Sequence, residues 1–295
     1  MLKTIKPKGK IVFLYLCVPV AIYLFTVFIP LAAAGFYSLF EWKGGPQKSF
    51  IGLDNYIKLI NDKTFWESFS HNIYLVLICA ICQIGLALIF VLFINSKLVK
   101  FKGLHRTLAF FPSTVSAVAI GFIWMMIYDY RRGILNWVLE VIGRDDLKKV
   151  WLNEPDLVML LIAIPVVWQY IGYYMVILLS AIASIDNSVL EVAELDGANA
   201  FQRTRYIILP LIRNTLLVCI TLCIAGNMKA FDHIYVMTNG GPGTSSMVMA
   251  LYGYKVSFDH MNMGYGSTIS MGIFVLSLIL ILCVNKIAKK MSRGE

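Results

Sequence analysis

The sequence predicts an all-α membrane protein that crosses the bilayer six times. Hydrophobic residues make up 59% of the 295 residues, charged residues make up 15%, and the mean hydropathy is +0.73. A soluble domain carries about a quarter charged residues, so the apolar excess must face lipid. A helix that crosses the hydrocarbon core needs about 20 mainly apolar residues. Six runs meet this requirement: 11–40, 69–96, 108–128, 157–184, 213–238 and 266–285.

Several of these runs are longer than the bilayer requires, which predicts tilted helices or amphipathic extensions. Pro19, Pro30, Pro112 and Pro165 lie inside runs, where a proline can kink a helix without unfolding it. The first run is too long for a cleaved signal peptide and has no clean small-residue cleavage site, so we expect it to remain as a span.

The distribution of lysine and arginine predicts the side of the membrane on which each loop lies. Six spans put both termini on one side. Four segments of that side carry four, four, three and four basic residues: 1–10, 97–106, 203–213 and 286–293. Because cytoplasmic loops are enriched in basic residues, we expect both termini in the cytoplasm, with a basic tail at 1–10 and a single transmembrane domain at 11–295. Topology accounts for the net charge of +9, and nucleic-acid binding need not be invoked.

The sequence contains few candidates for metal-binding, phosphate-binding or catalytic sites. Cys79 and Cys82 have the spacing of half a zinc site, but no second pair completes it, so all six cysteines are expected to be packing residues. The sequence lacks the G-x-x-x-x-G-K-[ST] pattern of a phosphate-binding loop, and GGPGTS at 240–245 is expected to be a turn. No constellation for intramembrane catalysis is visible. We therefore expect no enzyme activity, no metal site and no bound cofactor in this chain.

A patterned polar segment, EVAELDGANAFQRTRYIILP, follows the fourth run. Glu191–Leu195 is expected to be a short helix that ends at Asp196-Gly197, because Gly permits positive φ and Asp favours turns. A second helix is expected over Ala198–Leu209, with Pro210 marking a helix start or bend into the fifth run. The segment therefore predicts a helix-turn-helix on the cytoplasmic face.

This segment resembles the "EAA" loop of ABC-importer permeases, through Glu191-Val192-Ala193, Gly197 and Ile208-Leu209-Pro210. The sequence departs from the family pattern at Val192, where alanine is usual. Three further motifs, FIGLDNY at 50–56, GILN at 133–136 and FDHIYVMTNGGP at 231–242, resemble those of the carbohydrate-type permeases in this family.

The resemblance implies a type I ABC-importer permease fold with a coupling helix in the loop 185–212, between spans four and five. In the family this helix docks into a cytoplasmic ATPase, so Gly197 would make its turn and Leu209-Pro210 would set its exit. The residues of this sequence that match the coupling loop are Glu191, Ala193, Glu194, Asp196, Gly197, Ala198, Leu209 and Pro210.

The resemblance also implies partners and a location. A second, homologous permease would complete the pathway as a heterodimer, two ABC ATPase subunits that use ATP and Mg would bind below, and a solute-binding protein would dock above. The membrane would be the prokaryotic cytoplasmic (inner) membrane, and the cargo a di- or oligosaccharide. Other cargoes of the family, such as glycerol phosphate or a peptide, stay open.

Two clusters of polar groups at membrane depth are candidates for a substrate pathway, because such groups are costly in lipid and mark cavities or packed interiors. The first cluster is in the fourth run: Trp168, Gln169, Tyr170, Tyr173 and Tyr174. The three tyrosines are spaced to share a helix face, where rings can stack on a sugar and hydroxyls can bond to it. The alternative is interhelical packing around Gly172.

The second cluster is Asn227, Lys229 and Asp232 in the fifth run. Asn227 is a candidate for the pathway, whereas Lys229 and Asp232 are expected mainly as a structural pair or gate on one helix face. The outer segments 41–68 and 239–264 are long enough for short surface helices. A gradient-driven secondary transporter is the rival from a different class, but no acidic residue lies near a span centre, where its ion site is expected.

Overall fold

The computed structural model describes residues 9–95 and 99–293, with the side chains of Ile11, Leu14, Asn95, Met291, Ser292 and Arg293 left out. Lys3, Lys6 and Lys8 of the predicted basic tail, together with Lys97, lie outside the described residues. The chain folds into two compact units. One is formed by the residues up to Asp62 together with Gly253–Gly272, and the other by Lys63–Tyr252 together with the residues from Ile273 onward.

The first unit begins with an apolar helix that contains one π-helical turn. Its elements are α1 (Gly9–Tyr23), the π-turn Leu24–Phe28, α2 (Ile29–Tyr37), β1 (Phe40–Trp42), β2 (Lys48–Phe50), α3 (Asp54–Ile60) and the π-turn Lys255–Asp259. The two strands pair antiparallel, with Phe40 opposite Phe50. The outer segment 41–68, for which short surface helices were expected, thus contains a hairpin strand as well as α3.

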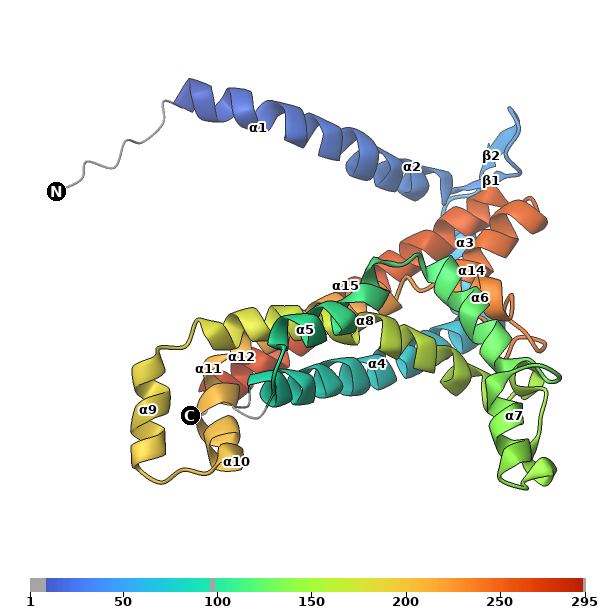
Figure 1. The fold of residues 1–295 in the computed structure, drawn as a ribbon. Coiled ribbons are helices and arrows are strands. Elements are labelled where there is room, and N and C mark those ends of the chain that lie inside the picture. Colours follow the sequence, from blue (N-terminus) through green and yellow to red (C-terminus); the bar gives the residue numbers. More distant parts are fainter. Residues whose placement is uncertain (1–8, 96–98, 294–295) are drawn as a thin grey trace. The chain divides into compact units, whose positions relative to one another are not determined.

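The second unit contains most of the helices (Figure 1). Its elements are α4 (Lys63–Asn95), α5 (Lys102–Phe110), α6 (Ala117–Tyr128), α7 (Ile134–Val141), α8 (Val158–Ala183), α9 (Asn187–Leu195), α10 (Ala200–Arg203), α11 (Leu209–Leu211), α12 (Arg213–Asn227) and α13 (Asp232–Met237). Two further helices have residues in both units: α14 (Met249–Tyr254) and α15 (Met263–Arg293).

Four described helices are long and apolar enough to cross a membrane: Tyr15–Tyr37, Lys63–Ile94, Val158–Ala183 and Met263–Lys290. Two further pairs qualify only as bent spans, since Lys102–Thr114 meets Ala117–Tyr128 at 98° and Ala200–Leu211 meets Arg213–Asn227 at 73°. The all-helical membrane fold is confirmed with four to six spans. The run 108–128 is not one continuous helix, because the backbone at Val115 is extended, and it can be a span only as a bent pair of helices.

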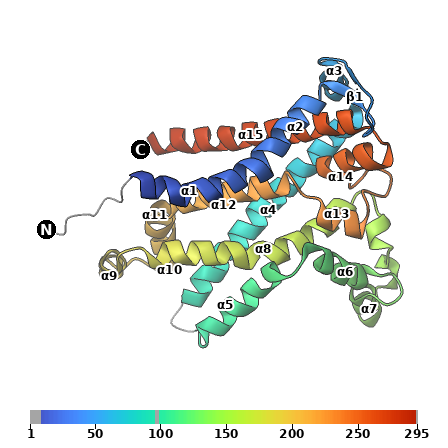
Figure 2. The same cartoon turned by 90° about the horizontal axis from the view of Figure 1, so that it is seen from above.

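The core of the second unit forms where α4 and α8 pack against each other (Figures 1 and 2). Gly172 of α8 lies so close to the chain before α6 that a Cβ there would overlap the carbonyl oxygen of Ala109. Gln169 of α8 donates through Nε2 to the carbonyl oxygen of Val115 at 2.9 Å, which satisfies the broken backbone at the bend. Contacts from α8 therefore hold the 98° bend.

Candidate functional site: the loop between α8 and α12

The predicted helix-turn-helix is present and begins at Asn187, with three residues between it and the end of α8. The carboxylate of Asp186 caps α9 by accepting a hydrogen bond from the backbone N–H of Ser188 at 3.0 Å. This hydrogen bond lowers the pKa of Asp186 below its ordinary value, because it favours the charged form. Ala193 is the buried residue of the helix. The side chain of Asp186 thus fixes the residue at which α9 begins.

The turn after α9 is a Schellman motif built on Gly197. Its φ of +77° lies in the left-handed region, where a side chain is strained. The N–H of Gly197 bonds to the carbonyl of Glu194 at 3.1 Å, and the N–H of Ala198 bonds to the carbonyl of Ala193 at 3.0 Å. These two bonds satisfy the last carbonyls of α9 and fix the direction in which the chain leaves it.

The second helix starts at a capping box. The side chain of Asn199 accepts from the N–H of Gln202 at 2.9 Å, and the side chain of Gln202 accepts from the N–H of Asn199 at 2.9 Å. Sequence reasoning missed both residues, although the N-x-x-Q spacing before a helix is a readable signal. The helix therefore begins at Ala200 and not at Ala198.

The second helix is also less regular than expected. A π-turn over Thr204–Ile208 separates α10 from α11, and Pro210 lies in the first turn of α11. The chain then bends by 73° into α12, directly after Leu211. Pro210 thus accompanies a bend, as the sequence predicted.

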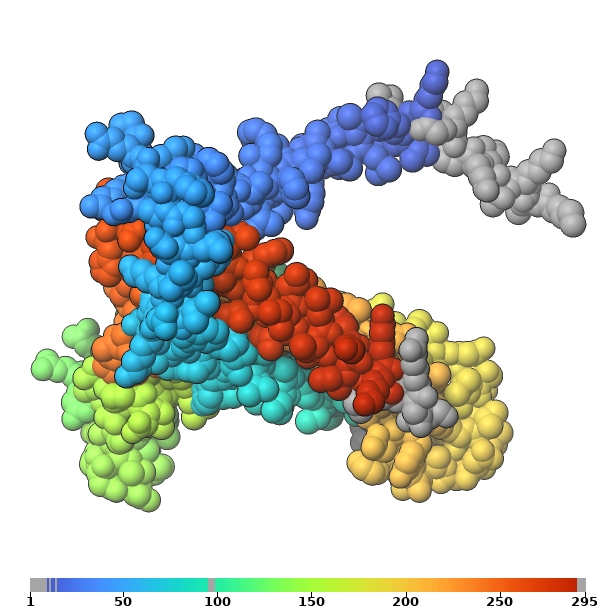
Figure 3. All heavy atoms as spheres, turned by 180° about the vertical axis from the view of Figure 1, so that it is seen from behind, coloured from blue at the N-terminus to red at the C-terminus, as the bar shows by residue number. Residues whose placement is uncertain are grey.

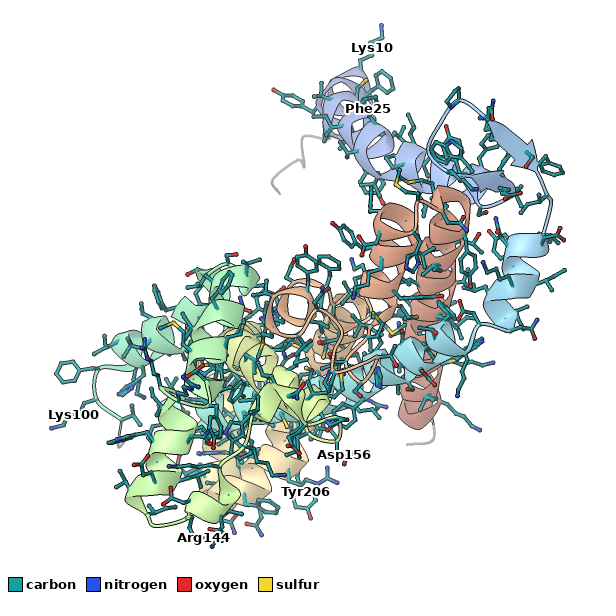
Figure 4. All side chains as sticks on the ribbon, turned by 90° about the vertical axis from the view of Figure 1, so that its right-hand side faces the viewer. Lys10, Phe25, Lys100, Arg144, Asp156 and Tyr206 are labelled. Carbon is teal, nitrogen blue, oxygen red and sulfur yellow. The ribbon has the colours of Figure 1, made fainter. Side chains whose placement is uncertain are left out.

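The two helices of the loop are linked by an ion pair and expose apolar side chains. Arg203 lies 3.7 Å from Glu194 across the turn, but both side chains are partly exposed, so the pair adds little stability. Leu195 is 87% exposed, Phe201 is 75% exposed and Tyr206 is 72% exposed. Tyr206 is labelled in Figure 4. In the space-filling view the yellow and gold segment that contains these three residues protrudes at one end of the second unit (Figure 3). We call residues 187–211 the knob.

The remaining residues predicted for the coupling loop occupy different positions in the knob. Glu191, Asp196 and Pro210 are exposed, whereas Ala198 and Leu209 are half-buried. A groove of about 1210 Å³ separates the knob from the helices that carry it. Its lining includes Leu88, Arg106, Leu179, Glu194, Phe201 and Arg203. The structure thus brings the loop residues into one helix-turn-helix, in which Ala193 is buried and most of the others are exposed.

The aromatic cluster of α8 divides between packing and open positions. Tyr174 is buried, whereas Tyr173 and Trp168 are exposed and Tyr170 is half-buried. The three tyrosines therefore do not form one open face. The Trp168 ring packs edge-on against Trp124, with ring centroids 6.1 Å apart. The interhelical packing at Gly172 that was weighed as the alternative is also present.

The polar residues after α12 are separated by a break in the helix. Asn227 is buried, and its side-chain amide donates to the carbonyl of Cys223 at 2.9 Å. The backbone carbonyl of Asn227 accepts from the side-chain amide of Asn72 in α4 at 2.8 Å. The helix ends there, and Asp232 begins α13. The expectation that Lys229 and Asp232 share one helix face is therefore wrong, because Lys229 lies in the turn between the two helices. Both side chains are exposed.

The other sequence motifs contain asparagines that hold loops in place. Asn55 donates to the carbonyls of Ser38 at 2.9 Å and Phe40 at 3.1 Å. Asn136 donates to the carbonyls of Tyr130 and Lys149 and accepts from the Trp151 indole. GGPGTS forms the expected turn, with positive φ at Gly240 and Gly243. Within the described residues, no group of three His, Cys, Asp or Glu side chains is arranged to hold a metal.

The described helices, long and apolar enough for four to six spans, are those of an integral membrane protein. Residues 83–293 match the family described as "Binding-protein-dependent transport system inner membrane component", and the chain belongs to this family. The match confirms the resemblance found in the loop motifs and identifies the chain as an ABC-importer permease of the inner membrane.

Individual relatives agree with this assignment. The chain is 33% identical over 284 residues to the probable ABC transporter permease protein YurN of Bacillus subtilis, which covers 96% of this chain and 97% of that protein. It is 29% identical over 287 residues to the diacetylchitobiose uptake system permease protein NgcF of Streptomyces coelicolor, covering 92% and 81%.

A solved structure shares the fold. The fold matches a chain of a bacterial alginate ABC transporter, crystallised with an alginate pentasaccharide-bound periplasmic protein, with a TM-score of 0.82. The match covers 95% of this chain and 94% of that one at 20% sequence identity, so it shows a common fold.

Proposed function

We propose that this permease imports a di- or oligosaccharide, and that the conformational change of an ATPase is transmitted to it through the knob. It would form half of the pathway, beside a second, homologous permease, with both termini in the cytoplasm. Two ATPase subunits would bind ATP and Mg, and this chain would bind neither. A solute-binding protein would deliver the sugar from the opposite side of the membrane.

The geometry of the knob is the observation that carries the coupling proposal. A capped helix, a Schellman turn and a capping box restrict its internal motion, and exposed apolar side chains give it a surface suited to a protein groove. The knob joins α8 through only Ser184, Ile185 and Asp186 and joins α12 at a bend. A push on the knob would therefore move two spans together, as a rigid-body transition requires.

Substitution of an exposed apolar knob residue tests the coupling proposal. Leu195→Glu places a charge where the ATPase groove would desolvate it, so the ATPase that co-purifies with the full-length chain should fall at least tenfold. Ile57→Glu is the matched control, since Ile57 is a 59% exposed apolar residue of another short helix, α3. Equal ATPase recovery from both variants would contradict docking through the knob.

The sugar cargo is supported by the relatives and by the open aromatic residues of α8. NgcF is named for diacetylchitobiose uptake and the structural neighbour for alginate. Trp168 and Tyr173 expose rings that can stack on sugar C–H faces, and Asn227 is held at the end of α12. Substrate contact by Tyr170, Tyr174, Lys229 or Asp232 remains a prediction.

ATP hydrolysis by the assembled complex tests the cargo. The complex in lipid nanodiscs, with its binding protein, should hydrolyse ATP several-fold faster when a cognate di- or oligosaccharide is added. Glycerol phosphate and short peptides serve as the comparison cargoes. Stimulation by one of these and by no sugar in the panel would replace the sugar proposal while leaving the coupling proposal intact.

A further inference from the structure

The helix α7 divides its side chains sharply between two sides. Successive residues of a helix are about 100° apart, which places Ile134, Trp137, Val138, Val141 and Ile142 within one arc of about 140°. All five side chains are at least 41% exposed. An apolar arc of this width is the half of an amphipathic helix that is normally covered.

The opposite side of α7 is fixed to the protein. Asn136 is 2% exposed, and its three hydrogen bonds join the helix to the turn before it and to the segment after it. Leu135 packs against the core of the second unit. Gly133 permits the close approach at the start of α7, because a Cβ there would overlap the carbonyl oxygen of Asp129. The GILN motif therefore orients α7 so that its apolar arc points away from the protein.

The position of α7 places this arc at the end of a candidate span. It follows α6, whose exposed Phe122 and Met126 belong to a candidate span, after a turn of only five residues. Figure 1 shows α7 running across the direction of α4, and Figure 2 views it nearly end-on, so it lies crosswise to α4. It lies near the start of α8, whereas the knob follows the end of α8, about 39 Å away at 1.5 Å per residue.

The turn before α7 presents two arginines, within a segment, 129–156, that carries five basic and six acidic residues. Arg144, Lys148 and Lys149 each form an ion pair with an acidic residue of the same segment. Arg131 and Arg132, in the turn that links α6 to α7, are exposed and form no ion pair with another described residue. Exposed arginines beside an apolar arc that contains a tryptophan are typical of a helix that lies in the headgroup region.

We propose that α7 is an interfacial anchor. Its apolar arc would enter the leaflet opposite the knob, with Arg131 and Arg132 at the level of the phosphates. The anchor would fix the depth in the membrane of the segment that joins α6 to α8. A partner protein could cover the same arc, and the following experiment separates the two occupants.

Trp137 fluorescence reports directly on what covers the arc. Full-length protein, with the subunits that co-purify with it, is placed in nanodiscs made with ordinary phospholipid or with phospholipid brominated at acyl carbons 6 and 7. The difference between wild type and Trp137→Phe isolates the emission of Trp137. Trp151→Phe is the matched control in the same segment, because Trp151 is half-buried and hydrogen-bonded to Asn136.

We expect the brominated lipid to remove at least half of the Trp137 emission and acrylamide to affect it little, with the Trp151 emission unchanged by bromine. Strong acrylamide quenching without bromine quenching would place the arc in water and overturn the proposal. Protection from both quenchers would show that protein covers the arc and would overturn it equally.

Discussion

The hydroxyl of Tyr128 donates a hydrogen bond of 3.0 Å to the carbonyl oxygen of Leu161. That carbonyl lies four residues before Pro165, which has no N–H to donate. A helix that contains proline within the membrane needs another donor for the freed carbonyl, because lipid offers none. Tyr128, at the end of α6, supplies that donor and joins the bent α5–α6 segment to α8.

Loss of the Tyr128 hydroxyl should therefore destabilise the chain only while the proline is present. Tyr128→Phe leaves a buried carbonyl unpaired, at a cost of about 1–3 kcal/mol. In a Pro165→Ala background the backbone N–H of residue 165 can bond to Leu161, so the same substitution should cost much less. A double-mutant cycle of thermal unfolding in detergent measures the coupling. Equal costs in both backgrounds would show that the hydrogen bond does not compensate for the proline.

Two glycines of the spans should respond in opposite ways to a small side chain. Gly172→Ala forces a methyl group against the Ala109 carbonyl and should destabilise the chain by about 1–3 kcal/mol. A Cβ at Gly226 meets nothing within 4 Å, so Gly226→Ala should be neutral or stabilising by up to about 1 kcal/mol. Unfolding midpoints of the two variants provide the comparison. Similar destabilisation by both would refute the close contact between α8 and Ala109.

The knob should lose stability in acid through Asp186. Its folded pKa is lowered, so the stabilisation that its cap gives α9 is fully present above its ordinary pKa of about 4 and is lost as the pH falls through the lower folded value. Asp186→Asn keeps an acceptor that does not titrate. Hydrogen exchange across α9 should therefore become relatively faster in acid for wild type than for the variant. The same pH dependence in both proteins would assign the effect to another group.

The capping box should contribute more to the local stability of the knob than the ion pair that accompanies it. Asn199→Ala removes the acceptor for the Gln202 N–H and should cost about 1 kcal/mol of local stability. Arg203→Gln breaks only a partly exposed pair, which is worth at most about 1 kcal/mol and usually less. Hydrogen exchange over residues 200–208 measures the loss of local stability in each of the two variants. A larger effect from Arg203→Gln would mean that the ion pair organises the turn.

The sequence could predict those features whose cause is local. Gly197 and Asp196 stand at the turn that they predicted, since a positive φ favours glycine. The fourth span was expected over 157–184 and occupies Val158–Ala183, because hydropathy measures apolar length.

The features that the sequence could not predict depend on contacts between distant segments. The bend at Val115 is held by Gln169, fifty-four residues away. The end of α12 is held by Asn72, which also accepts from the N–H of Met249 at 2.9 Å. Hydropathy does not distinguish a straight span from one that turns across the membrane. The open or buried state of each tyrosine in α8 likewise depends on neighbours that helical spacing does not identify.

Gly197 offers the most direct test of the central claim that the backbone of the knob positions it for an ATPase. No neighbouring atom lies within 4 Å of a Cβ at this position, so the strain of a side chain arises from φ alone. Asparagine tolerates the left-handed region, whereas a β-branched residue does not. We predict that Gly197→Asn keeps both the co-purifying ATPase and ATP-driven uptake near wild-type levels, and that Gly197→Val loses both at unchanged membrane expression. Retention of the ATPase and of uptake by Gly197→Val would contradict the account.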